Sequence, residues 1–238
     1  MTEPLFRDAY LREAPARVVA HTQEGGIVVE ASLFYPTGGG QPGDAGELEW
    51  DGGTLTVATA VKGEGGATVL LPGDGGALPP VGTKGMQRID WALRYRHMRV
   101  HTALHLLSVV IPLPVTGGQI SAQKGRLDFD MADPPGEKQA LAEALQELID
   151  RDLPVSDDWI TDAELQANPG LVKTMAVKPP MGQGRVRLVR IGAGPTQVDL
   201  QPCGGTHVAR TGEIGRIEIG KIEKKGARNR RVNVLLAD

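Results

Sequence analysis

Residues 90–110 read DWALRYRHMRVHTALHLLSVV, and this stretch predicts a long helix that carries a pair of histidines. Asp90 is a favourable N-cap residue, so the helix is expected to span residues 91–110. His101 and His105 are four residues apart, which places the two imidazoles one above the other on one face of the helix. The two rings are then close enough to bind one cation together.

A second segment, Cys203-Gly-Gly-Thr-His207, places two further metal-type ligands four residues apart. Either segment alone is a weak signal, because histidine pairs occur on ordinary surfaces and a lone cysteine is usually a small buried hydrophobe. The chain has five histidines and one cysteine, so the two segments together hold most of its candidate ligands. Three imidazole nitrogens and one thiolate suit zinc better than magnesium or calcium. We therefore predict one zinc ion per chain, bound by His101, His105, Cys203 and His207.

These two segments, about a hundred residues apart, resemble the editing domain of alanyl-tRNA synthetases. No part of the chain resembles the aminoacylation domain, so the chain is more similar to the free-standing alanyl-tRNA editing proteins of the AlaX type. The resemblance runs from about Phe34 to about Arg231. It implies a trans-editing hydrolase that deacylates alanine tRNA mischarged with serine or glycine, with zinc as cofactor and tRNA as partner.

His97 lies one helical turn before His101 and suggests an alternative ligand set in which His207 is not used. Residues four apart rise about 6 Å along a helix, so side chains two turns apart do not easily bind one ion. We therefore interpret His97 as a residue that supports the site, faces tRNA or lies on the surface.

Short apolar runs between many Gly and Pro residues predict β-structure up to Pro79-Pro80. Strands are expected at 17–20, 26–30, 54–58 and 67–71, with a spacing that favours a small barrel. Further helices are expected at 136–151 and after the capping box Thr161–Glu164. Alternating strands at 126–131, 185–190, 197–200, 214–222 and 231–236 suit a sheet with helices on one face. The predicted class is α+β: a small N-terminal β-barrel-like domain over 1–88 is followed by an α+β zinc-binding editing domain over 89–238.

Composition agrees with a globular protein of a reducing compartment. The chain has 238 residues, enough to bury a sizeable core. One cysteine excludes an internal disulfide. No apolar run reaches membrane-spanning length and no charged-then-apolar signal is present, so we expect a cytoplasmic protein without a membrane partner. Aromatic residues make up 4% of the chain, so broad stacking platforms for bases are not expected.

A glycine-rich segment over residues 34–46 reads FYPTGGGQPGDAG. Gly38, Gly39 and Gly40 allow either a tight turn between strands or a close approach of the backbone to a ligand. The Lys-Ser/Thr ending of a phosphate-binding loop is missing, which disfavours a nucleoside triphosphate as ligand. The segment, with Gln41, is similar to the family's glycine-rich motif, which implies that it helps to shape the active-site side.

Ser121-Ala-Gln-Lys-Gly125 resembles the family's segment that lines the aminoacyl pocket, with Gln123 at the matching polar position. The residues alone indicate an exposed turn. A synthetase pocket for alanine cannot strongly reject an added hydroxyl, whereas a second pocket with a polar partner can recognise it. The resemblance therefore implies that Gln123, and Ser121 as a second candidate, contribute to the catalytic pocket.

Six cations lie within eleven residues, with Glu223 as the opposing charge: Lys221, Lys224, Lys225, Arg228, Arg230 and Arg231. A charge run is usually a solvated face. The net charge of −3 excludes a uniformly basic nucleic-acid binder but allows a local patch. Given the resemblance to a tRNA-editing family, we predict that these side chains contact the tRNA backbone.

The reaction implied by the resemblance is hydrolysis of the aminoacyl ester by water. No Ser-His-Asp or cysteine nucleophile motif is evident, and the residues identify no general base. Four protein ligands close a tetrahedral zinc site, whereas catalytic zinc usually keeps one position open. Either one ligand is loosely held or the ion is organisational. Two other classes remain open: an inactive zinc-stabilised tRNA-binding module, and a zinc hydrolase of a small ester or amide.

Overall fold

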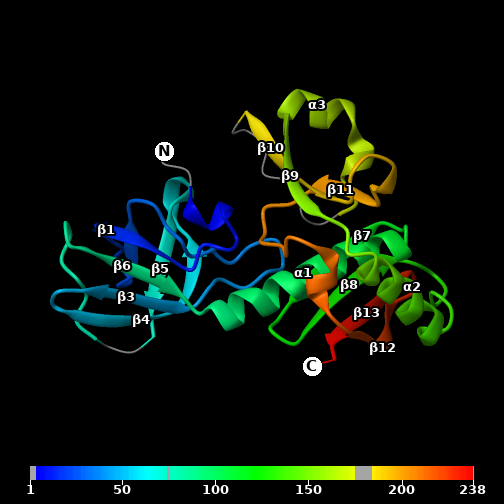
Figure 1. Cartoon of the computed structure of the whole chain (residues 1–238), viewed down its shortest axis with the longest axis horizontal. Helices are drawn as coiled ribbons and strands as arrows, with labels where there is room; N and C mark the ends of the chain where they lie inside the picture. Colours follow the sequence, from blue (N-terminus) through cyan, green and yellow to red (C-terminus); the bar gives the residue numbers. More distant parts are fainter. Residues whose placement is uncertain (1–3, 74–75, 175–183, 238) are drawn as a thin grey trace. The chain divides into compact units, whose positions relative to one another are not determined.

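The computed structural model describes residues 4–73, 76–174 and 184–237. The chain divides into two units, Met1–Tyr95, called the barrel unit below, and Arg96–Asp238, called the metal-site unit. Six described strands of the barrel unit close in the order β1-β2-β5-β4-β3-β6 (Figure 1). They are β1 (Glu13–His21), β2 (Ile27–Val29), β3 (Gly46–Trp50), β4 (Gly53–Lys62), β5 (Thr68–Pro72) and β6 (Lys84–Ile89), with 3-10 turns η1 (Leu5–Arg7) and η2 (Glu64–Gly66).

The barrel core follows from alternation along the strands. In β1 every second residue from Ala14 to Val18 is buried, and these side chains pack with Phe34, Leu48 and Leu70. The expected strands at 17–20, 26–30, 54–58 and 67–71 overlap β1, β2, β4 and β5, so the predicted small barrel is confirmed. The division at residue 88 stays a prediction.

Helix α1 (Trp91–Val110) has the predicted bounds, and Asp90 caps it because its Oδ1 accepts the Leu93 N–H at 3.0 Å. Its first turn is fixed by Arg94, a fully buried arginine. The Arg94 guanidinium forms an ion pair with the buried Asp44 and donates to the carbonyl of Leu33 at 2.9 Å. Because an unpaired buried charge is very costly, this pair strongly restrains the start of the helix.

The metal-site unit holds two sheets where the sequence predicted one. Their orders are β12-β13-β8-β7 and β11-β10-β9, and all described neighbours are antiparallel. The strands are β7 (Val115–Ile120), β8 (Lys124–Asp130), β9 (Val155–Thr161), β10 (Arg185–Ile191), β11 (Asp199–Pro202), β12 (Ile217–Gly226) and β13 (Asn229–Leu236). The remaining elements are α2 (Lys138–Asp150), α3 (Asp162–Ala167), η3 (Pro169–Leu171), η4 (Gly194–Thr196) and η5 (Thr211–Ile214).

Helix α1 lies along the four-stranded sheet (Figure 1). From His97 to Ser108 every side chain except Arg99 is buried. Gly125, at the start of β8, allows this close packing, because a Cβ there would lie 2.6 Å from Val100 and 2.9 Å from Leu104. Within the described ranges, no helix combines the length and the apolarity needed to cross a membrane.

Candidate metal centre and its supporting residues

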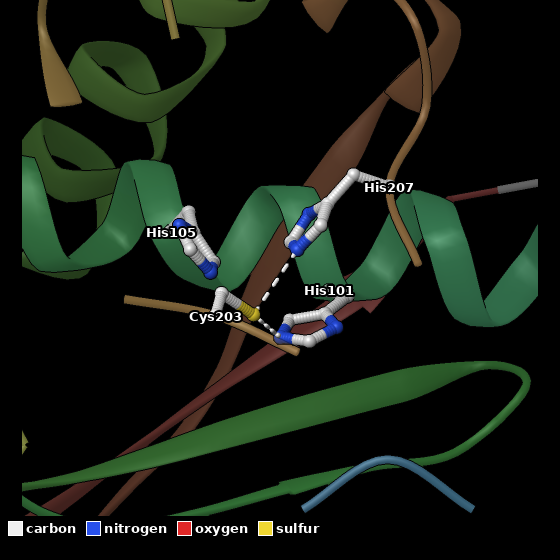
Figure 2. A group of neighbouring side chains, drawn as sticks. All are labelled: His101, His105, Cys203 and His207. Atoms are coloured by element: carbon white, nitrogen blue, oxygen red, sulfur yellow. Dashed lines mark hydrogen bonds between the residues drawn. The ribbon is translucent and has the colours of Figure 1, made fainter. Parts of the chain in front are cut away.

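The four predicted ligands meet in one cluster of the metal-site unit (Figure 2). His101 and His105 project from α1, whereas Cys203 and His207 come from the loop that follows β11. One ligand atom from each residue lies within 4.8 Å of the others. The Cys203 Sγ is 3.5 Å from His101 Nε2 and 3.3 Å from His207 Nε2. Among the described residues, this is the one group of three or more such side chains that could bind a metal ion.

These separations fit a tetrahedral zinc ion. Zinc binds nitrogen at about 2.0 Å and sulfur at about 2.3 Å, so two of its ligand atoms lie about 3.3–3.7 Å apart. The two distances from Cys203 Sγ fall near this range. The donor set of one sulfur and three imidazoles also matches the ligands that zinc prefers.

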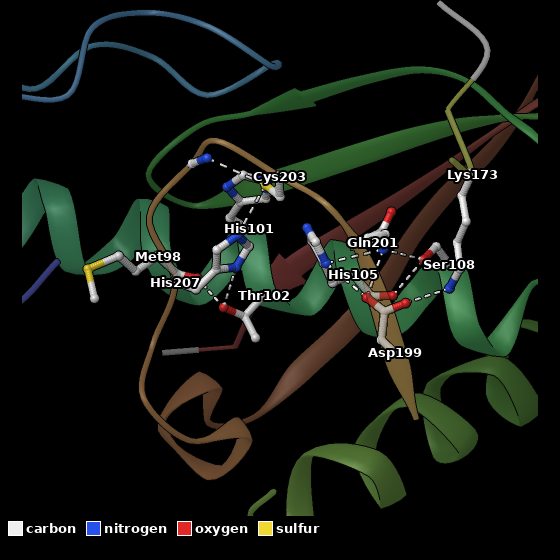
Figure 3. A network of polar contacts seen from close by, with 11 residues as sticks. Met98, His101, Thr102, His105, Ser108, Lys173, Asp199, Gln201, Cys203 and His207 are labelled. Carbon is white, nitrogen blue, oxygen red and sulfur yellow. Dashed lines mark hydrogen bonds and ion pairs between the residues drawn. The ribbon is translucent and has the colours of Figure 1, made fainter. Parts of the chain in front are cut away.

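The His105 ring is oriented by a buried carboxylate (Figure 3). Asp199 Oδ2 accepts the Nδ1–H of His105 at 2.9 Å, which leaves Nε2 to face the cluster. Lys173 Nζ lies 2.6 Å from the other carboxylate oxygen. The Gln201 amide donates to Asp199 Oδ2 at 2.8 Å and to Ser108 Oγ at 3.3 Å. A histidine that binds a metal typically has a carboxylate partner of this kind, because it fixes the tautomer and raises ligand basicity.

The hydroxyl of Thr102 orients the His207 ring in a similar way (Figure 3). Thr102 Oγ1 donates to the carbonyl of Met98 at 2.9 Å, so its oxygen is left to accept. It then accepts the Nδ1–H of His207 at 3.1 Å and the N–H of Val208 at 3.3 Å. The Nε2 lone pair of His207 is therefore directed at the cluster, as metal binding requires.

The turn between Cys203 and His207 is held by a buried arginine of β10. Arg187 Nη1 donates to the carbonyls of Cys203 at 3.0 Å and Gly205 at 2.8 Å. Its Nη2 lies 2.5 Å from Asp157 Oδ1 on β9. The Gly205 N–H also lies 3.5 Å from Cys203 Sγ, where it stabilises negative charge on sulfur.

The ionisation of the cluster suits a bound cation. Burial raises the pKa of Cys203, but its electrostatic interactions with the neighbouring imidazole rings and its hydrogen bond to His101 outweigh burial and hold that pKa well below its ordinary value. Burial and the charge of His101 hold the pKa of His207 well below its ordinary value. A thiolate and a neutral imidazole are the forms that bind metal.

His105 and Asp199 form a strongly coupled pair. Burial lowers the pKa of His105, but its hydrogen bonds to Asp199 and Cys203 raise it to about 9. Burial raises the pKa of Asp199, but its hydrogen bond to His105 lowers it to about 2. The hydrogen bond between His105 Nδ1 and Asp199 Oδ2 is a cause of both shifts, and it holds the ring in one orientation.

The supporting residues Asp199, Gln201, Thr102 and Arg187 were not predicted from the sequence. A signal for two of them is present: Asp199 and Gln201 precede Cys203 at intervals of two, and side chains two apart on a strand share one face. His97 is buried, so the surface alternative among its three interpretations is wrong, and a role in supporting the site or facing tRNA stays a prediction.

Gln123 and Ser121 lie at the tip of the β7–β8 hairpin. Both the N–H and the Oγ of Ser121 donate to the carbonyl of Lys124, which closes the turn, and Gln123 is exposed. Gly125 packs against Val100 and Leu104, on either side of His101 in the sequence of α1. This contact brings the hairpin tip to the part of α1 that carries the ligands; a role of Gln123 or Ser121 in the pocket stays a prediction.

The glycine-rich segment forms a tight turn within the barrel unit. Gly38 and Gln41 exchange two backbone hydrogen bonds of 3.0 Å, and Gly39 and Gly40 have φ of 59° and 83°. Two consecutive positive φ values strongly favour glycine. Further along the segment, Asp44 is buried and pairs with Arg94. These contacts explain the segment structurally; its influence on the active site stays a prediction.

The C-terminal cations separate into two groups. Lys221, Lys224, Lys225 and Arg228 are exposed on β12 and on the turn that leads to β13. Arg230 is buried and donates to the carbonyls of Gly226, Asn229 and Ala132, so its guanidinium stabilises the turn and is unsuited to the predicted tRNA contact. Arg231 is half-buried and pairs with Asp128 at 2.8 Å.

Comparisons with known proteins agree with this site. A family model described as the threonyl and alanyl tRNA synthetase second additional domain matches residues 186–233, which include Cys203 and His207. An alanyl-tRNA editing protein AlaX-M from Methanosarcina acetivorans is 37% identical over the full length of both chains. Another from Saccharolobus solfataricus is 34% identical over 98% of each chain. An alanine–tRNA ligase from Pyrobaculum calidifontis is 34% identical over 93% of this chain but over 25% of its own length.

The similarity thus covers the whole chain in the free-standing relatives and a quarter of the ligase. It includes both segments that carry the metal-type ligands. The chain therefore belongs to the family of AlaX-M alanyl-tRNA editing proteins, and it is an aminoacyl-tRNA deacylase that acts on tRNA.

Proposed function

We propose that this protein removes serine, and also glycine, from mischarged alanine tRNA at a zinc-containing site. The observation that carries the proposal is the buried set His101, His105, Cys203 and His207, in which Asp199 and Thr102 hold two of the rings with Nε2 facing the cluster. A ligand set that is supported to this degree is typical of metal proteins.

Within this proposal, water attacks the carbonyl carbon of the aminoacyl ester, and the terminal ribose hydroxyl leaves. When bound, a zinc ion supplies fixed positive charge to the site. The chain's own residues position the substrate: the hairpin tip with Gln123 borders the amino acid, and exposed cations bind the tRNA backbone. The vicinal ribose hydroxyl is our candidate for assisting proton transfer, because Cys203 and the three histidines are committed as ligands.

The test is deacylation of Ser-, Gly- and Ala-charged alanine tRNA by the purified protein, with and without a chelator. We expect hydrolysis of the seryl and glycyl esters, sparing of the alanyl ester, and loss of activity with the chelator that zinc restores. Binding of tRNA without hydrolysis would instead indicate an inactive tRNA-binding module. Hydrolysis of small esters without tRNA binding would indicate a zinc hydrolase.

Gln123 is expected to recognise the serine hydroxyl. Replacing Gln123 with leucine removes the polar partner at constant size, so kcat/KM for Ser-tRNA should fall about 10-fold or more, while tRNA affinity changes little. The matched control is Gln119→Leu, an exposed glutamine of β7 that bonds to Arg126 on the same hairpin. Equal deacylation rates for Gln123→Leu and the parent would place the pocket elsewhere.

The exposed cations are expected to hold tRNA without taking part in chemistry. Replacing Lys224, Lys225 and Arg228 with glutamine should raise KM and reduce the slope of log affinity against log salt by about one unit for each phosphate that is no longer neutralised. The rate at saturating tRNA should fall less, because these side chains bind ground and transition states equally. Zinc content should stay at the parent value.

Lys138→Gln on α2 is the control for a single exposed cation of the same unit. If the triple variant keeps the parent's slope of log affinity against log salt, the exposed cations only keep the strand edge soluble and do not contact tRNA. Arg230 is left unchanged in this experiment because its substitution would disturb the β12–β13 turn.

A further inference from the structure

One face of the three-stranded sheet β11-β10-β9 carries the residues that support the metal cluster. Asp199 and Gln201 project from this face of β11 to His105 and Ser108 on α1. The strand register extends the face: Val189 on β10 is paired with Gln201 on β11 and with Asp157 on β9. Directly paired residues of antiparallel strands project to the same side, so these side chains share the face.

Trp159 and Arg185 lie further along this face. Trp159 on β9 is paired with Arg187 on β10, and Arg185 is two residues before Arg187. The guanidinium of Arg187 donates hydrogen bonds to the carbonyls of Cys203 and Gly205. Trp159 is thus the direct cross-strand partner of the arginine that fixes the turn between Cys203 and His207. The Cβ atoms of such directly paired residues lie about 5 Å apart.

Trp159 is unusual for a tryptophan because 37% of it is exposed. The exposed Arg185 stacks on it, with the guanidinium carbon 4.3 Å from the ring centroid. The opposite face of the sheet is different, since it buries Val186 and Leu188. An exposed indole beside a cation, on the face that leads to the metal cluster, combines a flat apolar surface with positive charge.

We propose that Trp159 and Arg185 form a stacking site for an unpaired nucleobase at the 3′ end of the tRNA. This inference rests on the proposed function, since it concerns the RNA end that carries the ester. Unpaired bases bind proteins by stacking on aromatic rings and on guanidinium planes, and the neighbouring charge favours the phosphates that accompany them. One such site holds a single base, so it does not require the broad platform that the low aromatic content excludes.

The first test compares Trp159→Ala and Trp159→Phe with the parent in deacylation of seryl-tRNA. Loss of base stacking should raise KM by about 5- to 150-fold in the alanine variant, whereas phenylalanine keeps a stacking ring and should remain close to the parent. Zinc content and the slope of log affinity against log salt should both stay at the parent values. In this respect the tryptophan variants should differ from the variant at Lys224, Lys225 and Arg228, in which that slope is reduced. Leu113→Ala, which removes another exposed apolar side chain of the same unit, should leave KM unchanged.

The second test does not depend on deacylation. The trinucleotide CCA is titrated against the protein while tryptophan fluorescence is recorded, with inorganic phosphate as the control ligand. We expect CCA to quench the tryptophan fluorescence of the parent. Most of that quenching should be absent in Trp159→Phe, although this variant still contains the fluorescent residues Trp50 and Trp91.

Equal CCA quenching in the parent and Trp159→Phe, or an unchanged KM in Trp159→Ala, would overturn the stacking site. A change of oligomeric state in Trp159→Ala would also overturn it, because the indole would then belong to an interface between copies. A parent protein that binds CCA through Trp159 yet leaves seryl-tRNA intact would refute the proposed function and retain the stacking site.

Discussion

Replacing Cys203 and His207 together with alanine should strip the protein of its zinc ion and reduce deacylation of seryl-tRNA by more than about 100-fold. Removing residues that only support a metal ligand already costs about 10- to 100-fold in affinity or activity, and removing two ligands should cost more. The measurement is zinc per chain by elemental analysis, together with the rate of ester hydrolysis. Circular dichroism separates loss of the ion from loss of the fold.

The matched control is His21→Ala in the barrel unit. This histidine also makes a hydrogen bond, to the carbonyl of Pro79 at 2.9 Å, but it lies outside the cluster. The control should retain one zinc ion per chain. A double variant that keeps the same zinc content as the parent would show that these four side chains are not the ligands.

Replacing Asp199 with asparagine should weaken zinc binding by about 10- to 100-fold. Asparagine is nearly the same size, but it removes the negative charge that faces both His105 and Lys173. The His105 imidazole then becomes a poorer ligand, and the Lys173 ammonium loses its partner. Competition with a chelator of known affinity measures the change.

Asp158→Asn is the control for this experiment. Asp158 pairs with Arg190 on β10 and projects from the face of the sheet opposite to Asp199. It should leave zinc affinity at the parent value. If Asp199→Asn and Asp158→Asn give the same chelator titration as the parent, the carboxylate does not tune the site.

The features that the sequence predicts well are local in the chain. The bounds of α1 follow from Asp90 and from apolar spacing, and the ligand pairs are read from spacings of four residues. The Thr161–Glu164 capping box is present at α3, where Glu164 N–H donates to Thr161 Oγ1 at 3.1 Å. These properties depend on neighbours within one helical turn, so the sequence alone contains them.

Features that depend on distant partners are not predicted by the sequence. Strand β6 contains the fully buried Gln87, whose amide bonds to the backbone of Leu33, Pro15 and Ala31; a polar residue in a core position hides the alternation. Strand β9 gives no signal because it is mostly polar. Arg230 resembles its neighbours in a charge run, but the turn carbonyls that bury it are defined only by the fold. The sequence also contains no sign that β8 pairs with β13 and β9 with β10, which is why it predicts one sheet.

The period-two arrangement of Asp199, Gln201 and Cys203 has a consequence for how this gene can change. Asp199 and Gln201 lie on one face of β11, and Cys203 follows the last residue of that strand, so inserting or deleting a single residue between Gln201 and Cys203 would turn the supporting pair away from α1 if the cysteine stayed in place. A point substitution in this segment can weaken the supporting contacts in part, whereas a change in the length of the segment would remove them altogether. Length variation among functional descendants should therefore be excluded from 199–203 and tolerated at exposed turns such as that around Gly65 and Gly66, where an added Cβ meets no atom within 4 Å.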